Sequence, residues 1–150
     1  MNSCHQASSP GVALEDHIFV AILKTADALS QEAEQLIKSA GLTMAQYNVL
    51  RILRGAGEQG LCCRELAERM ITRDPDVTRL LDRLERRGLL ARSRDSKDRR
   101  IITLRISAAG RRVLKDLDTP VAKHHRKQLS HMGQGDLRKL VELLEAARET

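Results

Sequence analysis

The chain has 150 residues, 41% of them hydrophobic and 31% charged, with a formal net charge of +6. This composition predicts one globular unit and excludes a largely disordered chain. No apolar stretch approaches the roughly 18 residues of a membrane span. A single Phe and a single Tyr disfavour nucleic-acid binding by base stacking, which needs aromatic platforms.

The N-terminal part of the chain is predicted to be a tail followed by helices. Residues 1–11 lack the basic and apolar regions of a secretion signal, so we expect a mobile tail on a cytoplasmic protein. From Leu14 to Ser39, apolar residues recur at spacings of three and four, which predicts an amphipathic helix. Gly41 ends this helix, and Thr43 is placed to cap a second one, Met44 to Leu53.

Two shorter helices are predicted after a glycine-containing loop at residues 54–60. The first covers Cys63 to Met70, with its leucine and methionine facing inward. The second covers residues 75–87 and carries an apolar stripe. We expect Asp74 to be its N-cap and Pro75 its first helical residue, because a capping side chain followed by proline is typical of a helix start.

The periodicity then changes from helical to alternating. Leu89 to Arg94 and Arg100 to Ile106 are predicted to be two strands joined by a polar, charged turn. Ser107 is expected to cap a further helix, which Pro120 should kink or interrupt. A final helix is expected with Asp136 as its cap. The predicted fold is therefore mainly α with a small β-hairpin: a winged helix-turn-helix with helices on either side.

The positive charge is concentrated in the middle of the chain. Residues 43–106 hold 15 Lys and Arg against 9 Asp and Glu, whereas the flanks hold 11 of each and are neutral. This concentration is the electrostatic footprint expected of phosphate binding. We therefore predict a DNA-binding region at 43–106. Residues 12–42 and 107–150 are predicted to form a helical dimerisation region, because a lone winged domain would leave their apolar stripes exposed.

The second of the two short helices has the features of a recognition helix. Such a helix fits the major groove and places its N-terminal residues on base edges. Arginine can bond guanine through two hydrogen bonds, threonine can reach a phosphate or a thymine methyl, and aspartate can accept a bond from cytosine or orient an arginine. Ordinary surface charge on a solvated helix is the alternative. The candidate residues are Arg73, Pro75, Asp76, Thr78, Arg79 and Arg83.

Four segments occur together in a characteristic order: LTMAQYNVL at 42–50, VTRLLDRLERRGLL at 77–90, DSKDRR at 95–100 and SAAG at 107–110. This combination resembles the MarR family of winged helix-turn-helix transcriptional regulators. The second segment is similar to the family's recognition helix and the entry to its wing, and the third to its D-x-x-D-R-R wing. The fourth is similar to its T-x-x-G helix start, with serine in place of threonine.

The resemblance implies a homodimer whose first and last helices interlock and whose two winged modules reach successive major grooves. It also implies that the wing tip enters the minor groove, where a narrow groove attracts arginine. By position, Arg100 would be the inserted side chain and Asp98 would hold it, with Lys97 and Arg99 near phosphates. Arg94, the last residue of the strand before the turn, is also assigned to the DNA-binding residues. A solvated hairpin turn is the alternative.

The function that the resemblance implies is a sequence-specific double-stranded DNA-binding regulator, predicted to be a repressor that a small molecule releases from a palindromic operator. Its ligand cleft would lie between the dimer helices and the winged module. Candidate lining residues are His17, Ala21, Tyr47 and Arg51. No cofactor or metal is predicted. No enzyme is predicted either, because the sequence offers no nucleophile, paired-carboxylate or phosphate-loop arrangement.

Two alternatives depend on other residues. Cys4, Cys62 and Cys63 are too few, and odd in number, for a disulfide framework, but a thiol-based redox-sensing regulator is an alternative function. A winged domain used for protein contact is another. His124 and His125 are predicted to be packed or partly exposed, with a metal or pH-sensing role as the alternative.

Overall fold

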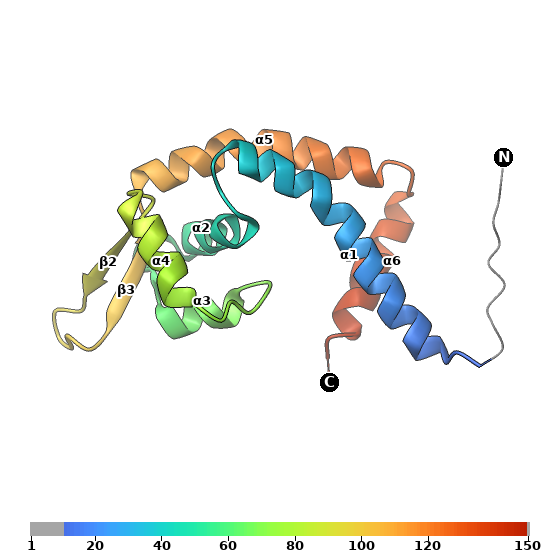
Figure 1. The fold of residues 1–150 in the computed structure, drawn as a ribbon, viewed down its shortest axis with the longest axis horizontal. Helices are drawn as coiled ribbons and strands as arrows, with labels where there is room; N and C mark the ends of the chain where they lie inside the picture. The colour runs from blue at the N-terminus through green and yellow to red at the C-terminus, as the bar shows by residue number, and fades with distance from the viewer. Residues whose placement is uncertain (1–10, 150) are drawn as a thin grey trace.

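The computed structural model describes residues 11–149, so the predicted tail lies outside the described residues except for Gly11. Figure 1 shows a winged module at one end of the molecule, with long helices that extend beyond it. The elements are, in chain order, α1 (Leu14–Ser39), α2 (Met44–Ala56), the single turn η1 (Gly57–Gln59), β1 (Leu61–Cys62), α3 (Cys63–Arg69), α4 (Val77–Arg86), β2 (Leu90–Arg94), β3 (Ile102–Ile106), α5 (Ala108–Leu129) and α6 (Gln134–Ala146).

The junction between α1 and α2 follows the prediction. Gly41, with φ of 77°, lies just after α1, in the left-handed region that glycine tolerates. Thr43 caps α2 through a reciprocal pair of bonds: the backbone N–H of Gln46 donates to Thr43 Oγ1 (3.1 Å), and the Thr43 N–H donates to Gln46 Oε1 (3.0 Å). The second of these bonds gives the side-chain oxygen of the buried Gln46 a partner. α2 extends past the predicted end at Leu53 to Ala56.

The sheet has three antiparallel strands in the order β1-β3-β2. The predicted hairpin is confirmed as β2 and β3, which pair from Leu90 opposite Ile106 to Arg94 opposite Ile102. β1 was not predicted; it places Leu61 opposite Leu104. A strand of two residues shows no alternation that a sequence pattern can reveal.

The hydrophobic core lies inside the winged module and is mostly leucine. Leu50, Leu66 and Leu84 of α2, α3 and α4 are fully buried at 0% exposure, as is Leu114 of α5. The first half of α5 therefore belongs to the core of the module. Gly110 is required at this contact, because a Cβ there would collide with the backbone carbonyl of Leu89.

The predicted start of the recognition helix is wrong by two residues. Its N-cap is Asp76, whose side chain accepts a bond from the Arg79 N–H (3.1 Å), and α4 begins at Val77. Asp74 is not the cap; its Oδ1 accepts the Asp76 N–H (2.8 Å) and so closes a turn. Pro75 lies inside that turn. An aspartate followed by a proline occurs both in such turns and at helix starts, so the sequence pattern does not distinguish them.

An interruption of α5 at Pro120 and the predicted cap of α6 are also wrong. α5 is not interrupted at Pro120, and Figure 1 shows it as one gently bowed helix. Proline costs the helix the bond to the carbonyl of Asp116, but both residues are exposed, so water can reach that carbonyl. α6 begins earlier than expected: Gly133 is its N-cap, and Asp136 lies in its first turn, where a carboxylate favours the helix dipole.

An ion pair that the sequence did not predict joins α2 to α5. Arg54 donates two hydrogen bonds of 2.9 Å to the carboxylate of Asp118. These hydrogen bonds lower the pKa of Asp118 and raise that of Arg54. Nearly half of the Asp118 side chain is exposed, so solvent weakens the interaction.

We expect Asp118→Asn to lower the free energy of unfolding by about 1 kcal/mol or less at neutral pH, the range of partly exposed ion pairs. Because the folded pKa is depressed, this contribution is present above the unfolded pKa and is lost as the pH falls through the folded pKa. Denaturant unfolding of wild type and variant between neutral pH and about pH 3 measures it. Asp116→Asn, an exposed neighbour on α5, is the control. A difference that persists at low pH would contradict the assignment.

Within residues 11–149, none of the helices combines the length and the apolar character needed to cross a membrane.

Candidate nucleic-acid interface

One face of α4 is buried and the opposite face is exposed. Leu80, Leu81 and Leu84 pack into the core, whereas Arg79 and Arg83 are exposed. Neither arginine forms an ion pair with any residue between 11 and 149. The predicted residue Thr78 is exposed beside them. α4 therefore presents guanidinium groups to solvent that are free to bind an anion.

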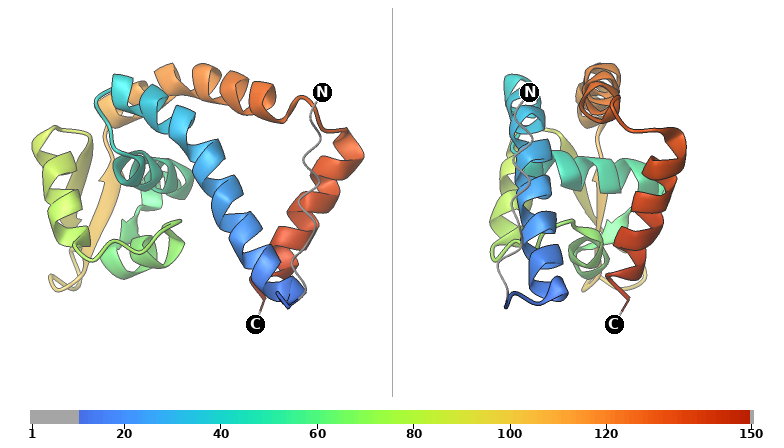
Figure 2. Two further views of the ribbon diagram at one scale, coloured as in Figure 1. Left: turned by 45° about the vertical axis from the view of Figure 1, so that its right-hand side comes forward. Right: turned by 90° about the vertical axis from the view of Figure 1, so that its right-hand side faces the viewer.

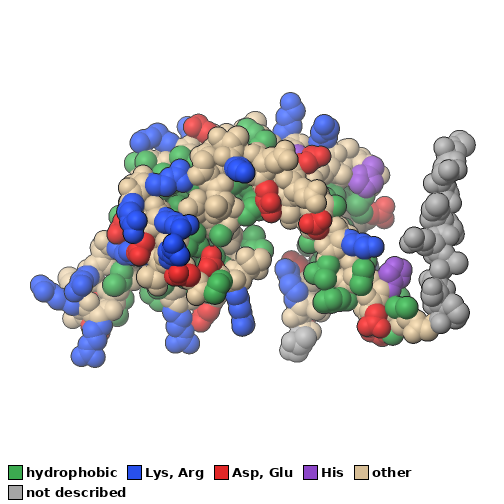
Figure 3. Space-filling model, in the orientation of Figure 1, with side chains coloured by type: hydrophobic (Ala, Val, Ile, Leu, Met, Phe, Trp, Pro, Cys, Tyr) green, Lys and Arg blue, Asp and Glu red, His purple; other side chains and the backbone are tan. Residues whose placement is uncertain are grey.

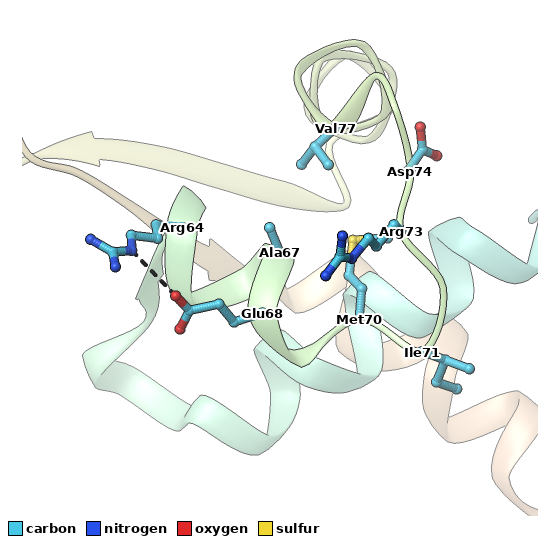
Figure 4. A pocket seen from close by; sticks show the side chains of 8 residues that line it. All are labelled: Arg64, Ala67, Glu68, Met70, Ile71, Arg73, Asp74 and Val77. Carbon is cyan, nitrogen blue, oxygen red and sulfur yellow. Dashed lines mark hydrogen bonds and ion pairs between the residues drawn. The ribbon is translucent and has the colours of Figure 1, made fainter. Parts of the chain in front are cut away.

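The turn before α4 is held in place by α2. Asn48 Oδ1 accepts the backbone N–H of Ile71 (3.0 Å), which fixes the path of the chain between α3 and α4. A surface groove of about 620 Å³ lies along this turn. Figure 4 shows Arg73 and Met70 at its centre and Val77 of α4 above them. Asp74, in the same groove, is turned toward the helix start.

Asp76 and Pro75 have structural roles in this turn. One carboxylate oxygen of Asp76 is engaged as the N-cap, which favours the start of α4. Both residues are exposed at the N-terminal end of the helix, next to Arg79, as expected from the sequence. Asp76 thus orients the first turn, and the capping bond competes with any bond that this oxygen would accept from a base.

The tip of the wing is organised by two aspartates. Asp95 Oδ1 accepts the N–H of Lys97 (2.7 Å), and Asp98 Oδ1 accepts the N–H of Arg100 (3.0 Å). Arg100 Nε also lies 4.0 Å from the same Asp98 oxygen. The Arg100 side chain is 96% exposed and projects from the turn, and Arg99 is exposed beside it. Asp98 therefore fixes the backbone from which Arg100 projects.

The base of the wing is held from both sides. Arg105 donates to the carbonyl of Glu58 (2.7 Å) and to Ser93 Oγ (2.6 Å), so β3 is tied to η1 and to β2. Arg92 on β2 bonds Asp82 of α4 at 2.7 Å. The wing is thus fixed relative to α4. Neither arginine was predicted to be functional, although the alternation along β2 places Arg92 on the side of Leu90.

The predicted basic residues gather at one end of the molecule. Figure 3 shows Lys and Arg side chains over the wing and α4, and hydrophobic side chains over α1 and α6 at the opposite end. The first group includes Arg94, exposed at the end of β2. An exposed helix and an exposed hairpin tip, both basic and held in a fixed relation, suit a major groove and the flanking minor groove of duplex DNA.

The four candidate ligand residues are not brought together in one protomer. Arg51 Cζ lies 5.7 Å from the centre of the Tyr47 ring, so these two form a cation–π contact. His17 and Ala21 are exposed on the N-terminal half of α1, which extends away from the winged module (Figure 2). Only the Tyr47–Arg51 pair lies at the module.

Cys62 has a structural role. It is the N-cap of α3, and its backbone N–H donates to the Glu65 carboxylate (2.9 Å). That backbone hydrogen bond lowers the pKa of Glu65. Cys63 is exposed in the first turn, and Cys4 lies outside the described residues.

His124 is packed between α5 and α1, with Nδ1 3.5 Å from Glu32, as expected for a packed histidine.

This arrangement defines a winged helix-turn-helix transcriptional regulator that binds double-stranded DNA. The chain matches the MarR family over residues 42–102. It is 34% identical to a MarR transcription factor from Planctomyces limnophilus whose crystal structure is known. The match covers 90% of this chain and 98% of that one, with a TM-score of 0.68. The chain therefore belongs to the MarR family, as its sequence motifs indicated.

Two further relatives extend the comparison. The transcriptional repressor MdtR of Bacillus subtilis is 38% identical over 82 residues, which are 55% of this chain and about half, 52%, of the repressor. PcaV of Streptomyces coelicolor, a transcriptional regulator crystallised in complex with its natural ligand, is 27% identical with a TM-score of 0.73; the match covers 95% of this chain and 99% of that one.

Proposed function

We propose that the protein represses transcription from a palindromic operator and that a small molecule releases it. α4 enters the major groove, and the wing tip enters the flanking minor groove. The observation that carries this proposal is the set of exposed arginines on α4 and the wing, held in a fixed relation at one end of the molecule. Such a regulator acts on DNA in the cytoplasm and needs no catalytic step.

The proposed contacts with DNA follow from the parts of the duplex that each element can reach. Arg79 and Arg83 lie on the face of α4 that reaches base edges, and Thr78 and Arg73 lie where phosphates pass. Arg100 enters the minor groove, and Lys97 and Arg99 contact the backbone on either side of it. Residues 43–106 thus form the DNA-binding region.

The remaining helices, from residues 12–42 and 107–150, form the dimerisation region of this proposal. No residue of α6 is buried, and the buried residues of α1, Ala33 and Ile37, both lie in its C-terminal half. Phe19 and Leu143 are 64% and 57% exposed. Because soluble monomers rarely expose apolar faces of this extent, a second copy covers them.

We expect the wild type to sediment as a dimer at micromolar concentration. The double variant Phe19→Glu with Leu143→Glu should sediment as a monomer, because charges in an apolar interface are costly to bury. Sedimentation equilibrium measures both, and circular dichroism checks that the helices are retained. The matched control is Glu142→Gln, which changes an exposed polar residue of α6. A monomeric wild type would contradict the proposal of a dimer.

Release by a ligand is supported by the resemblance to PcaV, which binds its natural ligand, and by the Tyr47–Arg51 pair at the module. Tyr47 is buried in the core and Arg51 is exposed beside it, so the Arg51 guanidinium is the group that suits an anionic ligand. In a dimer, the partner's α1 can complete the cleft that one protomer leaves open. His17 and Ala21 belong to this cleft only if α1 of the partner supplies them.

The test is binding to the DNA upstream of the protein's own gene. Fluorescence anisotropy should show tighter binding to a palindrome from that DNA than to a random duplex of the same length. A thermal-shift screen then identifies small molecules that stabilise the protein, and these should displace it from the palindrome. Equal affinity for both duplexes would contradict operator recognition, and a stabilising ligand that leaves the complex intact would contradict release.

A further inference from the structure

Arg92 occupies the junction between the wing and the recognition helix. Its Nη1 lies 2.7 Å from Asp82 Oδ1 and 3.4 Å from Glu85 Oε1. Asp82 and Glu85 are three residues apart on α4, so they share one face, and a single guanidinium reaches both. Along β2, Leu90 is buried, Arg92 is 25% exposed at its side chain, and Arg94 is exposed. Arg92 thus stands where the core ends and the DNA-facing surface begins.

The two carboxylates have a consequence for DNA binding. Asp82 and Glu85 are the acidic residues within α4, and their side chains are 39% and 41% exposed. Arg79 and Arg83 lie on the same short helix. A helix in the major groove is flanked by phosphates on both sides, so unpaired carboxylates on it would repel the DNA and attract its own arginines.

We propose that Arg92 is a positioning residue for DNA binding: it offsets one of the two negative charges of Asp82 and Glu85, and it holds the wing against α4. This inference rests on the proposed DNA-binding function. Arg92 acts through the charge of α4 and not as a phosphate contact, because its guanidinium is engaged with two carboxylates and three quarters of its side chain is covered. Arg79 and Arg83 stay free for DNA as a result.

The test compares Arg92→Met with the triple variant Arg92→Met, Asp82→Asn, Glu85→Gln. Arg92→Met should weaken operator binding at least about tenfold at moderate salt, because two uncompensated carboxylates then face phosphates. The triple variant should recover most of that loss, since it removes the carboxylates as well. Arg138→Met on α6 removes the same charge away from α4 and the wing, and it should change operator affinity little. Urea unfolding of each variant separates loss of binding from loss of folding.

Four results would overturn the proposal. A triple variant as weak as Arg92→Met, with a salt slope smaller by about 1 per site, would make Arg92 a direct phosphate contact. Unchanged binding by Arg92→Met would show that the carboxylates do not matter. If Arg92→Met fails to fold, Arg92→Lys replaces it: this variant keeps the charge, and weak binding by it at full stability would contradict a role based on neutralisation. A wild type without salt-dependent duplex binding would overturn the proposed function together with this inference.

Discussion

Raising the salt concentration from about 50 to 200 mM is expected to weaken binding of the protein to duplex DNA by about a thousandfold or more. Each protomer exposes basic side chains on α4 and at the wing tip, and a dimer doubles their number. Each phosphate contact releases condensed counterions, so the logarithm of the affinity falls linearly with the logarithm of the salt concentration. The contributing residues are Arg73, Lys97, Arg99 and Arg100.

The measurement is fluorescence anisotropy at several salt concentrations, with the operator and with a random duplex. The random duplex should show a steep slope as well, because the backbone contacts carry no sequence information. Lys97→Ala should reduce the slope by about 1 per phosphate contact that it removes. Lys139→Ala on α6, away from the wing, is the matched control. A flat salt dependence would favour a winged domain that contacts protein instead of DNA.

The winged module was predictable because its elements have strong periodicities. The stripe of Leu80, Leu81 and Leu84 predicts a helix with one buried face, and the alternation of Ile102, Leu104 and Ile106 predicts a strand. Leu104 and Ile106 are buried, but Ile102 is 41% exposed because β3 leaves the core as it approaches the wing tip. Burial therefore depends on where a strand lies in the fold as well as on its pattern.

Features set by tertiary contacts were not predictable in the same way. Asp74 and Asp76 are both residue types that cap helices, and only the hydrogen bonds decide that Asp76 does so. β1 exists because the backbone of Leu61 pairs with Leu104, a contact between segments far apart in the chain. Pro120 is tolerated because its side of α5 faces solvent. Each case depends on neighbours that a local pattern does not contain.

The residues of the candidate site also differ in whether local sequence patterns or tertiary contacts determine them. The proposed DNA-facing residues Arg79 and Arg100 were predicted from the helix face and the wing motif, which are local features, and both are exposed in the structure. The network around Arg92 joins α4 to β2 and was missed, although residues 82 and 85 share a helix face and residue 92 follows the strand alternation. The proposed ligand cleft was the least predictable, since the N-terminal half of α1, which carries His17, extends away from the module that contains Tyr47 of α2.

Arg79→Ala and Arg100→Ala are expected to weaken operator binding in different ways. Arg79 projects from the first turn of α4, where a guanidinium reaches the O6 and N7 atoms of guanine. Its removal should cost about 1–3 kcal/mol at the operator and relax the preference at one base position. Thr78 is exposed next to it and can bond a phosphate, so Thr78→Ala should instead weaken all sequences evenly.

Arg100 lies at the wing tip, and the minor groove that it is proposed to enter presents a largely degenerate edge pattern. Arg100→Ala should therefore weaken binding to the operator and to A·T-rich duplexes alike, with a smaller salt slope. Asp98→Ala should act in the same direction, because the Asp98 carboxylate accepts the Arg100 N–H and fixes the turn from which the side chain projects. A panel of single-base operator variants, measured with each mutant, distinguishes the two arginines. If Arg100→Ala relaxes one base position while Arg79→Ala lowers all affinities equally, the wing reads the sequence and the helix anchors the backbone.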